Sequence, residues 1–489
     1  MHDDMFTKGA RGEFRGDFSR DTFDPMRHFS RVLMQQGRVQ LDADWNEQVS
    51  ILLHYMRQLG RDLMGPHGAP YPDDDVTKED LEKLFENFKI KPSKSNPPNF
   101  FIAHGRYYVN GICCENSNDI NFRDQEGFPF SPEEPELSEG TYLVYLDVWE
   151  RHLTYVEDDY MREKALGGAD TAARSQIVWQ VKAMAKSSLA NWEKFQGANY
   201  SYQCFLDVLA DQTSPGTGQL KARAKKTSGD DNDPCRTAPE ASYRGAENQL
   251  YRVEIHNSNK DGSTATFKWS RENGSVIFPI TNIGTDQITL EHLGRDDRFG
   301  LQPGDWVEVL DDDVILRNKA NPLLKVTAVD KESLQVTLEG TPASNVGKDL
   351  AKHPYLRRWD QKKGVNKYGV IPVTAGNGEN DWILLEDGVE VQLFKIFKER
   401  IDAVRGELAV AERKAESVAG AMKKALDDLG GGAGLDVKER KSKFVAAVFG
   451  AKLDVAAIKM KMEAVYQTGD YWLIPARTAT KDVEWPQDE

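Results

Sequence analysis

Three residues near the start of the sequence, Asp42, Asp44 and Asn46, have the spacing of the first ligands in a calcium-binding loop of the EF-hand type. Such a loop also needs a glycine at its sixth position and a glutamate at its twelfth, and these positions hold Glu47 and Leu53 here. An acidic residue followed three positions later by Glu47 is instead typical of the first turn of a helix. We therefore interpret Asp44 as part of a helix start, and we predict neither a metal ion nor a cofactor.

Other groups with catalytic potential carry weaker signals. Ser270, Arg271 and Glu272 resemble part of an active site, but a polar turn between two strands explains them better. The acidic runs at 73–75 and 311–313 have the chemistry to bind a cation, but we interpret them as solvated turns. The nine histidines form no HxH, HExxH or HxxxH pair, and the GxSxG, P-loop and GxGxxG signatures are absent. The sequence therefore predicts that the protein is not an enzyme, although two carboxylates brought together by folding, as in a glycosidase, stay an open alternative.

Cysteine content and net charge restrict the class of partner. Cys113, Cys114, Cys204 and Cys235 form no CxxC pair, which argues against a zinc site. The formal net charge of −15 would repel phosphate backbones and anionic lipids. The charged N-terminus has no signal-peptide pattern, and no run of ~18 apolar residues could span a membrane. We expect synthesis in the cytoplasm and partners that are other proteins, with neither nucleic-acid binding nor a direct membrane span.

The first 65 residues predict a helix–strand–helix clamp. Asp24, followed by proline, indicates the start of a helix that Gly37 ends, and residues 39–41 form a short extended crossing. A second helix begins near Asp44 and ends at the Gly-Pro pair 65–66. We expect its apolar stripe to be buried against the β-rich part of the chain or against a neighbouring chain. The stripe consists of Val49, Leu52, Leu53, Met56, Leu59 and Leu63.

Alternating apolar residues predict strands over most of the remaining chain. FFIAHGRYYVNGICCEN indicates a hairpin with its turn at Asn110-Gly111. TYLVYLDVWERHLTYV and SQIVWQVKAM indicate long strands, and LQPGDWVEVLDDD with PLLKVTAVDKESLQVTL indicates a small barrel. The polar stretch from 205 to 240 is typical of a long exposed loop or linker. We expect the strands VEVQLF and DYWLIP to pair with each other across the base of an insertion.

That insertion, residues 397–465, carries two heptad seams joined by a glycine-rich loop. Apolar residues, among them Val418 and Met422, recur with 4-3-4-3 spacing from Phe397 to Leu429 and again from Phe444 to Val465. This pattern predicts an antiparallel helical hairpin with arms of roughly 45 Å. A hairpin folded flat on the body is the alternative, but no third apolar stripe is obvious, which favours a projecting arm.

The N-terminal block GDFSRDTFDPMRHFSRVLMQQGRVQLDADWNEQVSILLHYMRQLGRDLMGPHG closely resembles the opening of a family of proteins of unknown function. Proteins of that family are encoded with extracellular contractile injection systems and related phage-tail-like particles. Blocks further along, such as YLVYLDVWERHLT, FKWSRENGSVIFPI and GDYWLIPARTATKDVEWP, look like the same family. The N-terminal pattern is also similar to segments that attach tail fibres to baseplates. The insertion at 397–465 departs from the family, and relatives often continue beyond the point where this chain ends.

The resemblance implies a structural subunit at or around the baseplate of such a particle, in fibre attachment, a cage or the periphery of a spike. A surface- or glycan-binding module, or a carbohydrate-cleaving spike-type module, is the alternative. We expect an α+β, mainly β, multi-domain chain that forms homo-oligomers and leaves the cell, if at all, with the particle. The predicted interface residues are Phe29, Leu33, Trp45, Leu53, Met56, Val418 and Met422. The predicted units are 1–65 (docking segment), 66–200 and 201–300 (β-rich), 301–345 (barrel), 346–396 with 466–489 (C-terminal β module) and 397–465 (hairpin).

Overall fold

A computed structural model describes most of the chain outside the predicted hairpin. It covers residues 14–70, 87–93, 98–128, 136–189, 192, 204–206, 208–209, 216–225, 243–247, 249–343, 345–373, 381–394 and 464–485. The hairpin predicted for 397–465 lies outside these residues apart from its last two positions, and so do Val418, Met422 and the acidic run at 73–75. The described part is mainly β and contains several sheets, as the sequence predicts.

Of the two helices predicted for the N-terminal clamp, the structure contains only the second. Helix α2 (Asp42–Met64) ends where the pattern places it but begins two residues before Asp44. Leu41 is the N-cap, and the Asp44 carboxylate accepts from its backbone N–H, so the capping box predicted for Asp44 and Glu47 is wrong. The first predicted helix is wrong, because a 3-10 turn, η1 (Pro25–Arg27), replaces it. Asp24 caps this turn as expected, but His28 takes a left-handed conformation with φ 55° and ends it. Phe29 and Leu33, the apolar residues that would support a longer helix, are exposed, and a short helix without such packing is marginal in water.

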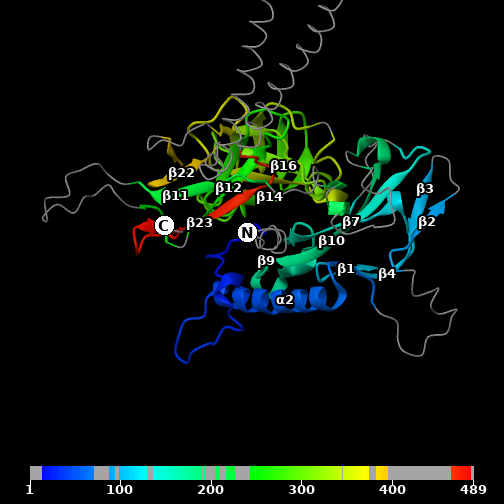
Figure 1. Ribbon diagram of the computed structural model, residues 1–489. Helices are drawn as coiled ribbons and strands as arrows, with labels where there is room; N and C mark the ends of the chain where they lie inside the picture. Colours follow the sequence, from blue (N-terminus) through cyan, green and yellow to red (C-terminus); the bar gives the residue numbers. More distant parts are fainter. Residues whose placement is uncertain are drawn as a thin grey trace, which may run out of the picture.

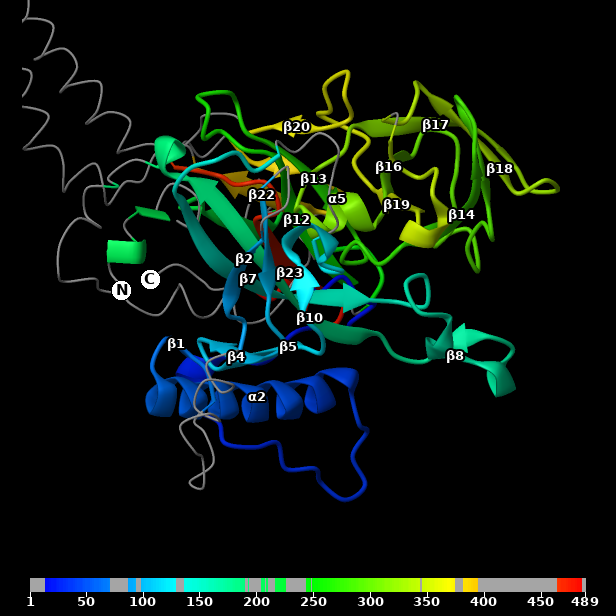
Figure 2. The ribbon, with the colours of Figure 1, turned by 90° about the vertical axis from the view of Figure 1, so that its right-hand side faces the viewer.

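The sheet β1-β4-β5 lies beside α2, and the long ribbon of β7 and β10 lies beyond it (Figures 1 and 2). β4 (Gly105–Val109) and β5 (Ile112–Asn116) form the predicted hairpin, with positive φ at Asn110 and Gly111. β7 (Tyr142–Leu153) and β10 (Arg174–Ala185) are the two predicted long strands and pair along their whole length. The neighbouring short strands are β1 (His67–Gly68), β2 (Ile90–Ser93), β3 (Asn99–Ile102), β6 (Ile120–Asn121), β8 (Arg162–Glu163) and β9 (Ala169–Asp170).

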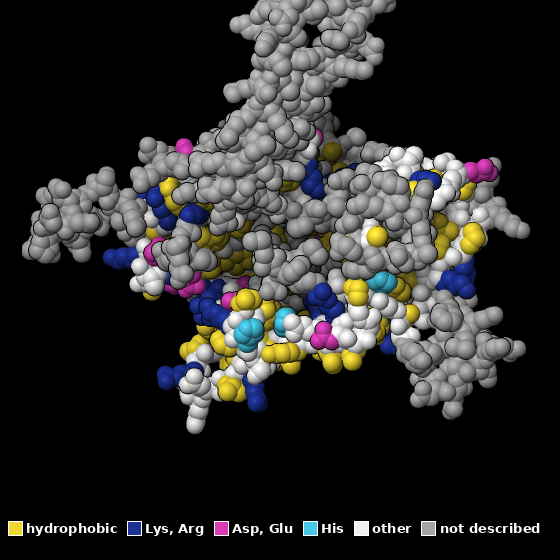
Figure 3. Space-filling view, in the orientation of Figure 1, with side chains coloured by type: hydrophobic (Ala, Val, Ile, Leu, Met, Phe, Trp, Pro, Cys, Tyr) yellow, Lys and Arg dark blue, Asp and Glu magenta, His cyan; other side chains and the backbone are white. Residues whose placement is uncertain are grey.

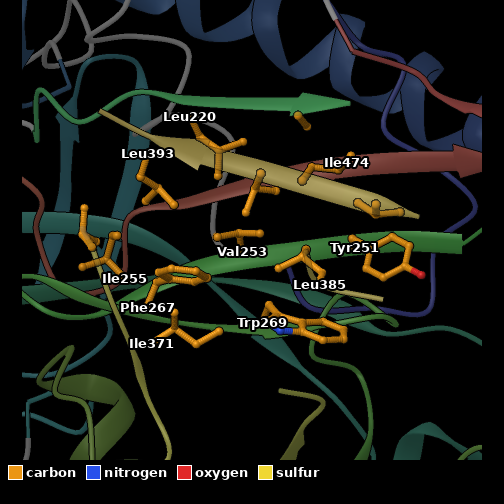
Figure 4. Close-up of a cluster of buried hydrophobic side chains, with 14 of the residues drawn as sticks. Leu220, Tyr251, Val253, Ile255, Phe267, Trp269, Ile371, Leu385, Leu393 and Ile474 are labelled. Atoms are coloured by element: carbon orange, nitrogen blue, oxygen red, sulfur yellow. The ribbon is translucent and has the colours of Figure 1, made fainter. Parts of the chain in front are cut away.

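The centre of the body is a pair of sheets that enclose the largest apolar core. One has the order β20-β13-β12-β23-β24, and the other has the order β11-β22-β21. Figure 4 shows Leu220 and Leu393 of the second sheet pointing toward Phe267 and Trp269 of the first. The strands are β11 (Leu220–Ala224), β12 (Gln249–Asn257), β13 (Thr266–Ser270), β20 (Ile371–Pro372), β21 (Ile383–Leu384), β22 (Val389–Leu393), β23 (Tyr471–Arg477) and β24 (Asp482–Val483).

Two sequence predictions are wrong in this core. β11 lies inside the stretch interpreted as an exposed linker, because Leu220, Ala222 and Ala224 alternate with polar residues and are buried. β22 and β23 do not pair with each other: β22 lies between β11 and β21, and β23 lies between β12 and β24. The two strands meet across the core instead of side by side, since each places one apolar face in the same cluster.

The predicted barrel is present and larger than its expected range. Six strands close in the order β14-β15-β18-β17-β16-β19 around an apolar interior that includes Phe278, Ile288 and Val336. Three of them lie within 301–345, and the others come from either side. The strands are β14 (Ile277–Ile283), β15 (Gln287–Leu290), β16 (Trp306–Leu310), β17 (Leu323–Asp330), β18 (Gln335–Glu339) and β19 (Tyr355–Trp359), with helix α5 (Asp312–Leu316) after β16.

Short 3-10 turns connect several strands. They are Phe122–Asp124, Asp159–Met161, Lys164–Leu166, Lys186–Ser188 and Leu350–Lys352. In the described part of the chain, no helix is long and apolar enough to cross a membrane.

Candidate assembly surface

One side of α2 is fixed to the body. Ala43 and Ile51 are each 1% exposed, and the Arg57 guanidinium pairs with the Glu150 carboxylate of β7. Near the end of the helix, a Cβ atom added to Gly60 would lie 3.2 Å from the Cα of Gly111 in the β4–β5 turn. The side of α2 that carries Ala43, Ile51, Arg57 and Gly60 therefore packs against the body.

The segment before α2 follows the helix through polar contacts. The backbone N–H of Ser19 donates to Asp42 at 2.9 Å, and the Thr22 hydroxyl donates to Glu47 at 2.6 Å. The backbone N–H of Val32 donates to the Gln48 amide oxygen at 2.8 Å. The acceptors of these hydrogen bonds are polar side chains of α2. The apolar stripe of the helix stays exposed to solvent.

The opposite side of α2 is an exposed apolar seam, which we name the α2 seam. Its side chains range from 41% exposed at Val49 to 78% at Leu63, and Figure 3 shows hydrophobic side chains along the lower edge of the molecule, where α2 lies. Their spacing is 4-3-4-3-4, the repeat with which a helix packs on another helix. A contiguous exposed apolar patch rimmed by polar residues often marks an interaction site. The α2 seam consists of Trp45, Val49, Leu52, Met56, Leu59 and Leu63.

Of the predicted interface residues within the described chain, Trp45 and Met56 belong to the α2 seam. Phe29, Leu33, Trp45, Leu53 and Met56 are each exposed. Burial of the α2 stripe against the β-rich part is therefore wrong, because the body packs on the other side of the helix. Burial against a neighbouring chain stays a prediction. Val418 and Met422, the remaining two interface residues, lie outside the described residues.

An open cleft of ≈ 2920 Å³ separates α2 and the N-terminal segment from the body. Trp45 and Arg57 of the helix line one wall, and Arg15 and His152 line another part. The His152 imidazole lies between the Phe14 and Phe18 rings, with both ring centroids at 6.3 Å. Burial first, and then the positive charges of Arg357, Arg15 and Arg252, lower the pKa of His152 to about 3.

A buried ionic cluster that we did not predict from the sequence lies between the five-stranded sheet and the barrel. Lys268 of β13 lies at its centre, with Nζ 2.6 Å from Glu308 Oε2 of β16 and 3.4 Å from Glu254 Oε1 of β12. Arg15 and Arg252 pair with the other oxygen of Glu254 at 2.9 and 2.7 Å. These carboxylates hold the two layers together, because each is satisfied by groups from more than one element.

The detectable signal for this cluster was the alternation in YRVEIHN, TFKWS and WVEVL. A strand that alternates apolar and charged residues usually has one solvated face. Here the charged faces of two sheets meet each other, so Glu254, Lys268 and Glu308 are buried with the apolar faces. A single strand does not reveal which surface will cover it.

The Glu254–Glu308 pair is not arranged as a general acid and base. Burial raises the pKa of Glu254, but the charges of Arg15, Lys268 and Arg252 outweigh it and leave the pKa lowered. The pKa of Glu308 is lowered too, because Lys268 outweighs the effect of burial. Both carboxylates are therefore ionised at neutral pH, whereas glycoside hydrolysis needs one of its two in the acid form.

The acidic residues considered for metal binding have structural partners. Asp42 accepts hydrogen bonds from Ser19, and Asp44 accepts one from the backbone N–H of Leu41 at 3.2 Å. The run at 311–313 is not a solvated turn, because Asp311 caps α5 by accepting from the Val314 N–H at 3.2 Å. Among the residues that the structure describes, no group of three His, Cys, Asp or Glu side chains is placed to hold a metal ion.

The turn at 270–272 is polar, as expected, and is held by ion pairs. The Ser270 hydroxyl, at the end of β13, donates to Asp360 at 3.3 Å. The Arg271 guanidinium donates to both oxygens of Glu386, at 2.7 and 2.6 Å. These contacts connect the two sheets of the central body to the end of β19.

The described part of the chain is mainly β, with several sheets, and its helix α2 exposes an apolar face. The chain matches the model of a family described as a family of unknown function (DUF6519) over residues 14–203 and 194–396, and it belongs to that family. No curated protein and no solved structure matches the chain.

Proposed function

We propose that this protein is a structural subunit that joins a larger assembly by packing α2 against a helix of another subunit. The α2 seam carries the proposal, since its residues repeat at helix-packing intervals and all are exposed, while the other side of the same helix is fixed to the body. Helix-in-groove or helix-on-helix docking uses anchors at this spacing.

The chemistry of the seam favours a protein partner over a membrane. Amphipathic helices that bind membrane surfaces are rich in Lys and Arg on their polar face. The polar positions of α2 instead include Asp42, Asp44, Glu47 and Asp62, and the whole chain has a net charge of −15. An apolar helix face on an acidic protein is suited to another helix.

We further propose that the assembly is a phage-tail-like contractile injection particle, with this subunit at or around the baseplate. The support is the resemblance of the N-terminal block, which includes both the segment before α2 and α2 itself. The block that resembles fibre-attachment segments thus also contains the exposed α2 seam. The resemblance and the exposed seam therefore both support attachment to other subunits through this block.

The test compares α2 with an equally exposed apolar site elsewhere. Leu52→Glu together with Leu59→Glu should leave the chain folded, because both side chains are solvent-exposed, but should exclude it from particles purified from the native host and quantified by mass spectrometry. Leu350→Glu replaces a leucine that is also exposed, at 55%, outside α2 and should assemble normally. Normal incorporation of the double variant would refute docking through α2. Absence of the wild-type chain from such particles would refute the particle assignment.

A further inference from the structure

A buried guanidinium beside the ionic cluster has no carboxylate partner among the described residues. Arg357 of β19 is 6% exposed, and its Nη2 donates to the Tyr355 hydroxyl at 3.0 Å. Its Nε and Nη1 have no hydrogen-bond partner in that part of the chain. Burial raises the pKa of Tyr355, so this hydroxyl is neutral and does not balance the charge.

The carboxylates near Arg357 form their hydrogen bonds and ion pairs with other residues. Glu308 is its direct neighbour on β16, but Glu308 accepts from Lys268 and from the Trp359 indole N–H at 2.9 Å. Glu157, which also lies near Tyr355, accepts from Thr154 and pairs with Arg151 at 3.8 Å. Burial lowers the pKa of Arg357 and outweighs Glu254 and Glu308, which raise it. A buried cation without a carboxylate in direct contact is expensive, which indicates that something else supplies a counter-charge.

Two more arginines converge on the same place. Gly274 lies in the turn before β14, and a Cβ atom added there would be 3.5 Å from Cδ of Arg15, 3.7 Å from Cδ of Arg252 and 3.8 Å from Cδ of Arg357. Asn273 positions Arg15 by donating to the carbonyl oxygens of Phe14 at 3.2 Å and Gly16 at 3.0 Å. In the described part of the chain, Arg15 and Arg252 both pair with Glu254, and Lys268 pairs with Glu254 and Glu308.

We propose that Arg357, with Arg15 and His152, binds a small tetrahedral oxyanion of the phosphate or sulfate class. Access is from the cleft, because Arg15 and His152 both line it. The Nε–H and Nη1–H donors of Arg357 leave on different edges of the planar guanidinium, so an oxyanion bound there takes one of them together with donors of Arg15 and His152. Neutral His152 completes the site with a ring nitrogen that can donate.

The experiment uses the full chain, dialysed into phosphate- and sulfate-free chloride buffer. Isothermal titration calorimetry with sodium phosphate or sodium sulfate, at constant ionic strength, should show one saturable site per chain, and neither addition of sodium chloride nor dilution should reproduce it. Saturating anion should raise the melting temperature. A response to chloride as large as that to phosphate and sulfate would mean general screening and would overturn the proposal, as would the absence of saturable binding.

Arg357→Met separates a binding residue from a structural one. Without anion it should melt at a higher temperature than the wild type, because it removes an unbalanced buried charge, and it should weaken phosphate binding at least ~10-fold, since charged hydrogen bonds are lost. Arg295→Gln, at an exposed arginine of the same cleft, should bind phosphate normally. A destabilised or unfolded Arg357→Met would count against the proposal. Unchanged phosphate affinity in both Arg357→Lys and His152→Gln would overturn the oxyanion proposal even if Arg357→Met did not fold.

Discussion

Gly60 of α2 and Gly111 of the β4–β5 turn touch through their backbones. A Cβ atom at Gly60 would approach the Cα of Gly111 to 3.2 Å, and one at Gly111 would approach the carbonyl oxygen of Arg57 to 2.1 Å. The hairpin turn also needs positive φ at Gly111, which has a φ of 77°. One residue thus serves both the turn and the contact that holds α2 on the body.

Replacing Gly111 with alanine should therefore loosen α2. The positive φ alone costs about 1–3 kcal/mol, and the contact with the α2 backbone adds to it because no flexible side chain can move away. Limited proteolysis should cleave between α2 and the body sooner than in the wild type. Gly65→Ala is the matched control, since Gly65 has a φ of 81° with nothing within 4 Å of an added Cβ. Equal proteolysis of the two variants would contradict this role of the Gly60–Gly111 contact.

Adjacent residues of α2 should respond differently to truncation in the isolated chain. Ile51 is 1% exposed, so Ile51→Ala should cost about 2–5 kcal/mol of unfolding free energy. Leu52→Ala removes an exposed side chain and should cost less than about 1 kcal/mol. Denaturant unfolding measures both. If Leu52→Ala cost as much as Ile51→Ala, the seam would be covered in the free chain and the assembly proposal would lose its basis.

The sequence predicted the features that depend on neighbouring residues. The start and stop of α2 follow from Asp44 and Gly65, and the β4–β5 turn follows from Asn110-Gly111, since these residues fix local backbone geometry. The prediction of the first helix was wrong although Asp24 caps its first turn. A capping residue starts a helix, but a longer helix also needs an apolar face packed against the body.

Local sequence patterns could not predict the features that depend on contacts between distant segments. The apolar stripe of α2 was visible, but which side the body covers is decided by Ile51 and Gly60, which are not in the stripe. The buried cluster of Glu254, Lys268 and Glu308 needs two charged strand faces to meet, and no single strand contains that information.

Removing Lys268 should destabilise the contact between the five-stranded sheet and the barrel. Lys268→Met leaves Glu308 and Glu254 buried without their shared cation, and breaking a buried pair costs about 3–5 kcal/mol. Adding Glu308→Gln should recover part of the loss, since it removes one uncompensated charge. Lys331→Met, at a lysine that is 80% exposed, should change stability by less than about 0.5 kcal/mol. Thermal melting of the four proteins decides the matter: a Lys268→Met chain as stable as the wild type would show that the cluster contributes nothing.

Stability should fall as the solution is acidified below the usual histidine pKa, partly through His256. This residue is the bulge of β12, faces Lys268, Glu308 and Glu254, and is 5% exposed. Burial first, and then the charge of Lys268, lower its pKa to about 4, whereas the unfolded chain titrates near ~6.5. Because the unfolded state binds the proton more tightly, the stability from neutral His256 is complete above pH ~6.5 and is lost as the pH falls toward 4, by at most ~1.4 kcal/mol per pH unit. Urea unfolding between pH 7.5 and 4.5 should show a shallower decline in His256→Gln, which cannot take up the proton. Identical slopes in the two proteins would mean that His256 does not titrate between the folded and unfolded states as its burial requires.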